Sequence, residues 1–405
     1  RALVDGRSGL LGKFNPASYK RAVELVYGHL RQEPTYNPNG GLERFNSWLQ
    51  ADPELKRLYD ELRGALGTST GNYADLVTTL ERLNGQVSPS RPPMSAAPSA
   101  KPTPSAGPAA LPTATPTPVV PQAGVHTLVG LNGSGYVDGP VATAKLAGIE
   151  AIAVDPAGNL WVGETGNHRI RMITPEGTVS TVAGTGARGY VDGPGDQAQF
   201  GRLAGFYMDG LGTLYIADMA NKRIRKIDTL DATHTVTTVA SDLENPACIT
   251  QDEISSTLYV TEFSGLDVRK VELNGTSKKL ATGFSEPWGI AMLNAVLYVV
   301  DADAGAVKKV ELDGKVSSFA GGFLRPHGLA SDGKGYLYVA DQGHHRVQRI
   351  GADGGVDTIA GTGAAGDADG APETATLRSP TAVAVGPDGA VYVVDGIVDR
   401  IRVIR

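Results

Sequence analysis

The protein has 405 residues, enough for two or three domains with a large buried core. No stretch approaches eighteen uninterrupted apolar residues, and Cys248 is the single cysteine, so the composition excludes a membrane-spanning helix, an internal disulfide and a cysteine-rich zinc cluster. Residues 1–124 carry 13 Lys+Arg against 10 Asp+Glu, whereas residues 125–405 carry 24 against 33, a net charge of −9. Binding of nucleic acid depends on a basic surface, so this charge disfavours nucleic acid as a partner.

The first 86 residues have the apolar spacing of short helices. A stripe through Val23, Val26 and Leu30 is followed by a second one around Trp48, and "DPEL" supplies an N-cap with proline at the first helical position. We expect residues 1–86 to form a small all-α helical bundle that anchors the protein in a larger assembly.

Residues 87–123 are dominated by Pro, Ala, Ser and Thr. Such a composition cannot bury a core, and its prolines favour extended polyproline II conformations. This tract is therefore predicted to be a semi-rigid linker between the bundle and the remainder of the chain.

The rest of the chain, residues 124–405, is a repeat array. Each repeat reads as strand, tight polar turn and strand, with a short apolar strand before most copies and another after most. The six copies that align are "LWVGETGNHRIRMI", "LYIADMANKRIRKI", "LYVTEFSGLDVRKV", "LYVVDADAGAVKKV", "LYVADQGHHRVQRI" and "VYVVDGIVDRIRVI". Four strands per unit are typical of the blades of a β-propeller.

These motifs resemble NHL repeats, most specifically in "GETGNHRIRMI" and "AGTGARGYVDGP". The resemblance implies an all-β six-bladed propeller. The last unit stops after its third strand, at Arg405, and "VHTLVG" (residues 125–130) begins the array without a preceding module. We therefore expect these six residues to supply the missing fourth strand and close the ring.

An acid ends the second strand of every repeat. A residue repeated in all blades most often serves the blade itself, so these acids are predicted to accept turn amides and to face basic residues such as Arg169, Arg223 and Arg346. The acids are Glu164, Asp218, Glu262, Asp301, Asp341 and Asp395.

Three histidines fall in the tight turns that follow these acids: His168, His344 and His345. The positive φ of such turns is a sufficient reason for them. The alternative is a loosely held surface metal at "GHH", which lacks a third ligand in sequence.

Differences between blades are better candidates for a binding site. Aligned innermost strands place one residue of each blade at the same level beside the mouth of the central channel: Glu150, Ala204, Ala247, Trp288, His327 and Thr381. Trp288 and His327 are the two large members, and Glu286 and Arg325 lie two residues before them. We predict a partner-binding surface from Trp288, His327, Arg325, Glu286, Glu150 and Thr381, with exposed aromatic and arginine side chains as its anchors.

An enzymatic alternative arises from a second resemblance. The peptidyl-hydroxyglycine lyase is similar in fold, and its zinc is held by histidines from different blades. That resemblance transfers to His327 alone, because the other blades carry no histidine at this level. The alternative is therefore a metal-dependent lyase or hydrolase with its site at the channel mouth.

Long Gly- and Asp-containing connectors occur at three consecutive junctions of the ring, so one half of the face is expected to be walled and the other half open. Asp138, Asp192 and Asp369 occupy matching "DG" positions in them. Turn formation explains these residues, and calcium is the alternative ligand, although the acidic ladder of an EF-hand is missing.

Taken together, the sequence favours a non-enzymatic binding or assembly module over an enzyme, with no cofactor. The partner on the propeller face is expected to be a protein or a glycan. A Pro-, Ser- and Thr-rich stalk with a single cysteine is typical of an extracellular, cell-surface or virus-particle component, such as an adhesion protein.

Overall fold

The computed structural model describes residues 53, 56–57, 123–229, 231–252 and 255–405. Pro53, Lys56 and Arg57 are helical, and the rest of the predicted bundle and almost all of the predicted linker lie outside the described residues. The second of two compact units begins at Pro121 and holds the whole repeat array. Among the described residues, no helix is long and apolar enough to cross a membrane.

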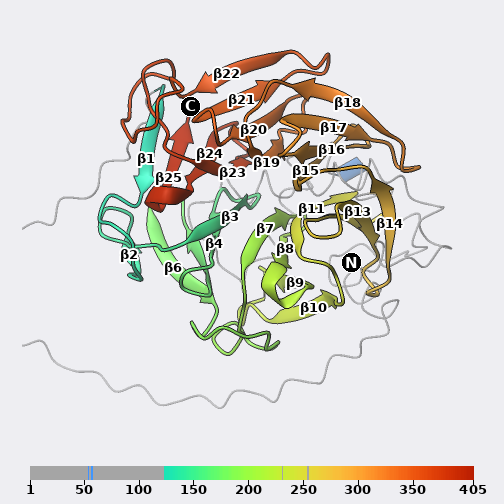
Figure 1. The fold of residues 1–405 in the computed structure, drawn as a ribbon. Helices are drawn as coiled ribbons and strands as arrows, with labels where there is room; N and C mark the ends of the chain where they lie inside the picture. Colours follow the sequence, from blue (N-terminus) through green and yellow to red (C-terminus); the bar gives the residue numbers. More distant parts are fainter. Residues whose placement is uncertain (1–52, 54–55, 58–122, 230, 253–254) are drawn as a thin grey trace, which may run out of the picture. The chain divides into compact units, whose positions relative to one another are not determined.

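The array folds into six antiparallel sheets, which are numbered here as blades 1 to 6 along the chain (Figure 1). Blade 1 contains β3 (Ile149–Val154), β4 (Leu160–Glu164), β5 (Arg169–Ile173), β6 (Thr178–Ala183) and, at its outer edge, β2 (Gly139–Pro140). Blade 2 contains β7 (Leu203–Met208), β8 (Thr213–Asp218), the short 3-10 helix η2 (Met219–Asn221), β9 (Arg223–Asp228) and β10 (Val236–Ala240). Blade 3 contains β11 (Pro246–Asp252), β12 (Thr257–Glu262), β13 (Asp267–Val271) and β14 (Ser277–Thr282).

The remaining blades follow the same order. Blade 4 contains β15 (Pro287–Leu293), β16 (Val296–Asp301), β17 (Ala306–Val310) and β18 (Val316–Gly321). Blade 5 contains β19 (Pro326–Ser331), β20 (Leu337–Asp341), β21 (Arg346–Ile350) and β22 (Val356–Ala360). Blade 6 contains β23 (Pro380–Val385), β24 (Val391–Asp395), the 3-10 helix η3 (Gly396–Val398), β25 (Arg400–Ile404) and β1 (Val125–Val129).

The predicted closure of the ring is confirmed. Strand β1 pairs antiparallel with β25, with Val125 opposite Ile404, so the last blade takes its fourth strand from the start of the array. The innermost strands of consecutive blades pack against one another all the way round, including β23 against β3. The sequence therefore predicts both the six-bladed propeller and its point of closure, which lies beside the C-terminus in Figure 1.

Burial falls from the centre of each blade to its edge. The second strand is nearly continuous in apolar residues and fully buried in β4, whereas the outermost strands β14, β18 and β22 are largely exposed. A strand covered by neighbours on both faces needs no polar alternation, which explains the runs "LWV" and "LYV". Among the described residues the hydrophobic core forms six clusters: five are each shared by two neighbouring blades, and the one around Trp288 extends from blade 2 to blade 5.

The long connectors also cover strand edges. In blade 1, β2 of the preceding connector pairs with β6. Single antiparallel bridges do the same in blades 2 and 6, where Gly193 lies opposite Val236 and Gly370 opposite Val125. The "DG" segments thus pair with the outermost strands of three blades, and unpaired outer edges are the usual weakness of open sheets.

Candidate functional site

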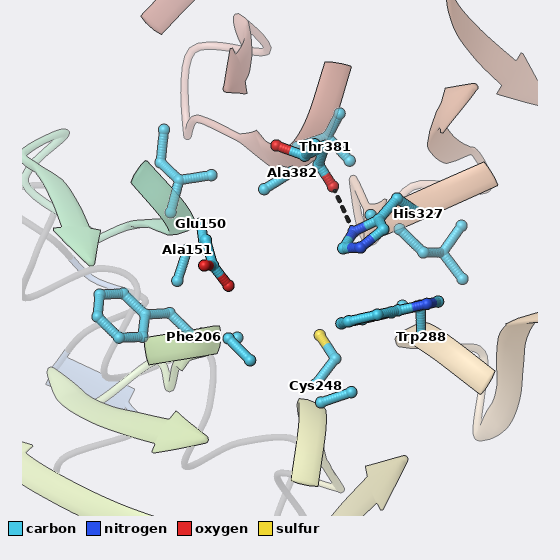
Figure 2. Close-up of a pocket in the computed structure, with 16 residues that line it drawn as sticks. Glu150, Ala151, Phe206, Cys248, Trp288, His327, Thr381 and Ala382 are labelled. Carbon is cyan, nitrogen blue, oxygen red and sulfur yellow. Dashed lines mark hydrogen bonds between the residues drawn. The ribbon is translucent and has the colours of Figure 1, made fainter. Parts of the chain in front are cut away.

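The structure brings the six aligned mouth residues together around one pocket. Glu150, Ala204, Ala247, Trp288, His327 and Thr381 all line it, one from each blade. Figure 2 shows four of these, with Glu150, His327 and Thr381 arranged around the opening and Trp288 beside His327. These positions lie at one level because each is the second residue of the innermost strand of its blade.

The pocket exists because the next position of each innermost strand is small. Those residues are Ala151, Gly205, Cys248, Gly289, Gly328 and Ala382. A Cβ on Gly205 would lie 2.5 Å from the carbonyl oxygen of Ala247, and one on Gly289 would lie 2.6 Å from the amide nitrogen of Leu329. Only glycine permits this approach of neighbouring strands. Below this ring lie larger apolar side chains such as Ile152 and Phe206, and the cavity among these residues is small, about 40 Å³.

Trp288 forms the largest wall of the pocket. Its ring stacks on His327 with centroids 4.0 Å apart and an interplanar angle of 30°, and Phe263 lies on it at 4.9 Å. The side chain is only 8% exposed, so the expectation of a freely exposed tryptophan is wrong. Neighbouring rings cover Trp288, and a ligand would meet it inside the pocket rather than on the surface.

His327 is held in one orientation. Its Nδ1 lies 3.0 Å from the carbonyl oxygen of Thr381, an atom that can only accept, so Nδ1 carries the proton. Burial, opposed by this hydrogen bond and assisted by the nearby cations Arg202 and Arg325, lowers the pKa of His327 to about 4. At neutral pH the imidazole is therefore uncharged, and Nε2 keeps a lone pair for an incoming donor.

The sequence analysis missed Arg202 as a member of this site. Its Nε lies 2.6 Å from Oε2 of Glu150 on the neighbouring blade, and its guanidinium lies 5.5 Å from the centre of the Trp288 ring. A signal was present, since Arg202 precedes Ala204 by two residues as Arg325 precedes His327. The pair forms a charged rim, with the Arg202 side chain 42% exposed.

Arg325 and Glu286, predicted as neighbours of the aromatic pair, form a second rim contact. Arg325 Nη2 lies 3.3 Å from Glu286 Oε1, and the same carboxylate oxygen accepts a 3.3 Å hydrogen bond from Trp288 Nε1. The Arg325 side chain is 60% exposed. The predicted residues thus lie together, as two cross-blade ion pairs at the edge of an otherwise apolar pocket.

The acids that end the second strands are structural, as predicted. Their carboxylates accept amides of the connector that leads into the same blade, for example Ala147 N to Glu164 Oε1 at 2.7 Å and Gly201 N to Asp218 Oδ1 at 2.9 Å. Their predicted ionic partners Arg169, Arg223 and Arg346 are wrong. The true partners in blades 1 and 2 stand two residues further along, because the strand alternation turns Arg169 away from the acid.

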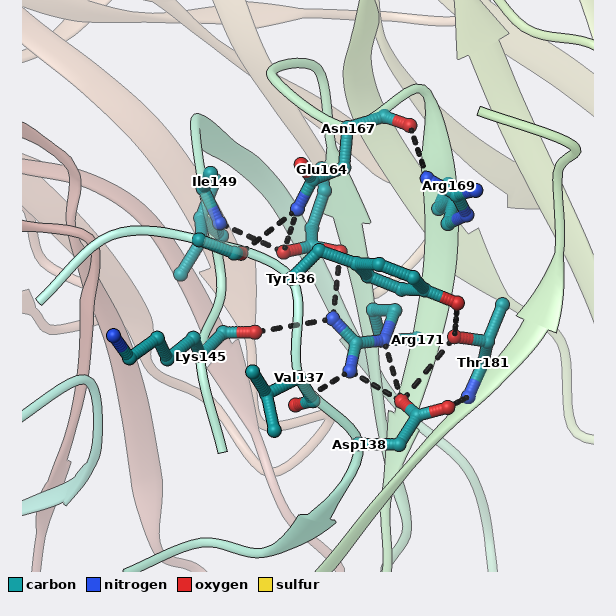
Figure 3. A network of polar contacts seen from close by, with 12 residues as sticks. Tyr136, Val137, Asp138, Lys145, Ile149, Glu164, Asn167, Arg169, Arg171 and Thr181 are labelled. Atoms are coloured by element: carbon teal, nitrogen blue, oxygen red, sulfur yellow. Dashed lines mark hydrogen bonds and ion pairs between the residues drawn. The ribbon is translucent and has the colours of Figure 1, made fainter. Parts of the chain in front are cut away.

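Arg171 shows the arrangement in blade 1 (Figure 3). Its fully buried guanidinium lies 2.9 Å from Glu164 Oε2, donates to the carbonyl oxygens of Lys145 and Val137, and pairs with Asp138. Asp138 also accepts the amide of Thr181 on the outermost strand. One arginine therefore joins the strand-ending acid, the long connector and the outer strand, and we name this set of contacts the arginine clamp.

The arginine clamp is repeated in the other two blades that follow long connectors. Arg225 holds Asp218 and Asp192 in blade 2, and Arg402 holds Asp395 and Asp369 in blade 6, the latter at 2.7 Å. The amides of Thr238 and Thr127 donate to Asp192 and Asp369. The three "DG" carboxylates are therefore engaged by guanidinium groups and outer-strand amides, and calcium binding by them stays a prediction.

The histidines of the turns are explained by two different features of the structure. His168 and His345 have φ of 50° and 57°. In blade 4 the same turn position is occupied by Gly305, with φ of 59°. The prediction that a positive φ explains the turn histidines is therefore confirmed for His168 and His345. His344 has no positive φ and instead lies 2.9 Å from Asp341 Oδ2. In the described part of the chain, no group of three or more His, Cys, Asp or Glu side chains is placed to hold a metal ion.

Comparison with known proteins identifies the family of the chain. The model of the virginiamycin B lyase family matches residues 131–401, and the chain therefore belongs to that family. A curated relative, protein SUPPRESSOR OF QUENCHING 1 of Arabidopsis thaliana, is 38% identical over 72 residues, which are 18% of this chain and only 7% of that protein.

Solved structures share the fold at low identity. A Bacteroides thetaiotaomicron protein of unknown function has a TM-score of 0.59 at 17% identity, covering 70% of this chain and 75% of its own. An auxiliary nutrient binding protein of the same organism has a TM-score of 0.57 at 17% identity, with coverage of 70% and 76%. A gluconolactonase of Xanthomonas campestris has a TM-score of 0.50 at 14% identity, with coverage of 69% and 88%.

Proposed function

We propose that this protein is a non-enzymatic binding module whose propeller accepts part of a protein or glycan partner in the pocket at the channel mouth. The observation that carries the proposal is the convergence of one residue from every blade on a pocket with a charged rim and an apolar floor. Concave apolar sites with a few convergent polar groups are the usual form of a binding site.

The rim supplies both signs of charge for orientation. Arg202 and Arg325 are the exposed members of their ion pairs, and each is joined to an acid of a neighbouring blade. A partner can donate to Glu150 and to Nε2 of His327 while it accepts from Arg202. The similar fold of a nutrient binding protein supports a binding role, although it says nothing of the ligand here.

The test uses an array of defined oligosaccharides and peptides with the full chain and two variants. The double variant Trp288→Ala, His327→Ala should lose binding by at least about tenfold, because truncation of anchors costs about 2 kcal/mol or more. A matched control is Tyr336→Ala with His344→Ala, which truncates an aromatic residue and a histidine outside the pocket lining. Ligands bound equally by the double variant, or an array with no ligand at all, would contradict the proposal.

A second candidate is a lyase or hydrolase with its site at the same channel mouth. The sequence predicts this alternative as a metal-dependent enzyme. The favouring observation is the neutral His327 with a free Nε2, a group suited to take a proton from a bound substrate. Family membership makes virginiamycin B the first compound to test, beside esters, lactones and hydroxyglycine peptides. Turnover lost in His327→Ala would establish the enzyme, and no turnover on any of these with or without added divalent metal would remove it. The described donors do not form a metal site, so no step is assigned to a metal.

We also propose that residues 1–86 anchor the protein in a larger assembly and that residues 87–123 give the propeller reach at an extracellular or cell surface. The support is the proline-rich composition of the tract. Surface labelling of intact producing cells with an antibody against the propeller tests it. Label restricted to lysed cells would contradict the location.

A further inference from the structure

The outermost strands of the six blades fall into two groups. Strands β6, β10 and β1 are paired with "DG" segments of the connectors, whereas no described segment pairs with the outer edges of β14, β18 and β22. Unpaired edges are normally blunted by charge. Strand β14 carries Lys278 and Lys279, and β22 carries Asp357, but β18 has the uncharged sequence VSSFAG with Ser317 and Ser318 exposed.

Blade 4 also contains most of an arginine clamp. Lys308 stands at the position of Arg171, and its Nζ lies 2.7 Å from the strand-ending Asp301 and 2.8 Å from the carbonyl oxygen of Gly283 in the connector. These contacts match those of Arg171 with Glu164 and with the Lys145 carbonyl. Among the described residues, Lys308 makes no contact with a "DG" aspartate and none with the carbonyl oxygen that corresponds to that of Val137.

The outer strand of blade 4 matches in register. Ser318 lies directly across from Lys308, as Thr181 lies across from Arg171. In the clamped blades the amide at this position donates to the aspartate, at 3.2 Å for Thr181. The Ser318 amide has no such carboxylate in the described part of the chain.

We propose that β18 is a strand-addition site for an extended peptide that carries an Asp-Gly pair. The incoming strand would lie antiparallel to β18, its aspartate would accept from the Ser318 amide and pair with Lys308, and its glycine would lie against the outer strand as Gly193 does against Val236. The occupant is argued from the chain's own three examples, in which a segment of this chemistry occupies the same edge. This surface lies at the rim of the ring and is separate from the mouth pocket.

The probe is a synthetic peptide of residues 188–198, "RGYVDGPGDQA", with blocked ends, measured by fluorescence anisotropy on the full chain. Replacing its Asp192 by asparagine should weaken binding about tenfold, because a charge-assisted hydrogen bond and an ion pair are lost. Ser318→Pro removes the edge amide and should abolish binding. The matched control Thr358→Pro makes the same change at the same position of β22 in blade 5 and should leave the affinity unchanged.

If Ser318→Pro does not fold, hydrogen exchange on the unaltered protein still locates the strand to which the peptide binds. The peptide should slow exchange within residues 316–321 and leave β14 and β22 unchanged. Three results would overturn the proposal: no binding at millimolar peptide, equal binding of the Asp192→Asn peptide, or protection confined to β10, which would show that the peptide merely replaces the chain's own connector.

Discussion

Blades 6, 1 and 2 differ from blades 3, 4 and 5 although all six share one strand pattern. The first group has long connectors, arginine clamps and paired outer edges; the second has short connectors, and Arg269, Lys308 and Gln348 at the clamp position. The difference teaches that complete burial of the arginine accompanies the long connector: the side chains of the three clamp arginines are 0% exposed, whereas that of Arg269, after a short connector, is 15% exposed. Trp288 lies in blade 4 and His327 and the exposed Arg325 in or beside blade 5, both of which follow short connectors.

The largest expected effect tests the clamp itself. Arg171→Met leaves the fully buried Glu164 carboxylate without its cation and should lower the free energy of unfolding by about 3–5 kcal/mol. Arg269→Met in blade 3 should cost clearly less, because Arg269 makes a long ion pair with Asp267, at 3.7 Å, and a 3.4 Å hydrogen bond to Ser277 Oγ. Urea denaturation measures both, with the exposed Arg188→Met as control. Equal losses of unfolding free energy for Arg171→Met and Arg269→Met would contradict the distinction between blades with and without an arginine clamp.

The strand-ending acid of blade 3 should make stability depend on pH. Burial raises the pKa of Glu262 to about 7 from 4.5, and its Oε1 has no hydrogen-bond partner. The folded protein then binds this proton more tightly than the unfolded chain, so stability falls as pH rises from about 4.5 to 7, by roughly 3 kcal/mol. Glu262→Gln should remove this fall in urea denaturation between pH 5 and 8. An unchanged pH slope in that variant, with exposed Glu176→Gln as control, would contradict the assignment.

A smaller effect is expected from the "DG" carboxylates. Asp192→Asn removes the charge that pairs with Arg225, but the aspartate is 42% exposed, so the loss should be about 1 kcal/mol or less. Exchange of the Thr238 amide should accelerate, since this amide donates to Asp192 at 2.9 Å. Asp196→Asn, an exposed acid on the same connector, is the matched control. A loss as large as that of Arg171→Met would mean that the aspartate of the connector, rather than the strand-ending acid, provides most of the stability of the arginine clamp.

The smallest expected effect concerns calcium. Asp138, Asp192 and Asp369 each face an arginine, which repels a cation, so millimolar calcium should leave the melting temperature unchanged. Differential scanning calorimetry with calcium and with chelator measures this. A rise that disappears in the triple Asp→Asn variant would establish the calcium alternative.

Much of the candidate site was accessible from sequence because every blade repeats the same strand pattern, although the connectors between blades differ in length. Aligning innermost strands selects Glu150, Trp288, His327 and Thr381 before any coordinates, and all four line the pocket. The same alignment places Arg202 at the position of Arg325, but it does not identify its partner. Its partner Glu150 is 52 residues away in the chain, and only the packing of blade 1 against blade 2 brings the two together.

The sequence by itself determined the number of blades, the strand that closes the ring and the level of the mouth residues, because strand alternation and repeat spacing are local properties of the chain. The tertiary structure decided which arginine meets each strand-ending acid, how far Trp288 is covered, and which outer edges are paired. These outcomes depend on burial and on distances between blades, which no local pattern encodes. Arg169 and Arg171 look interchangeable in "RIRMI", yet only Arg171 lies beside the buried Glu164 carboxylate.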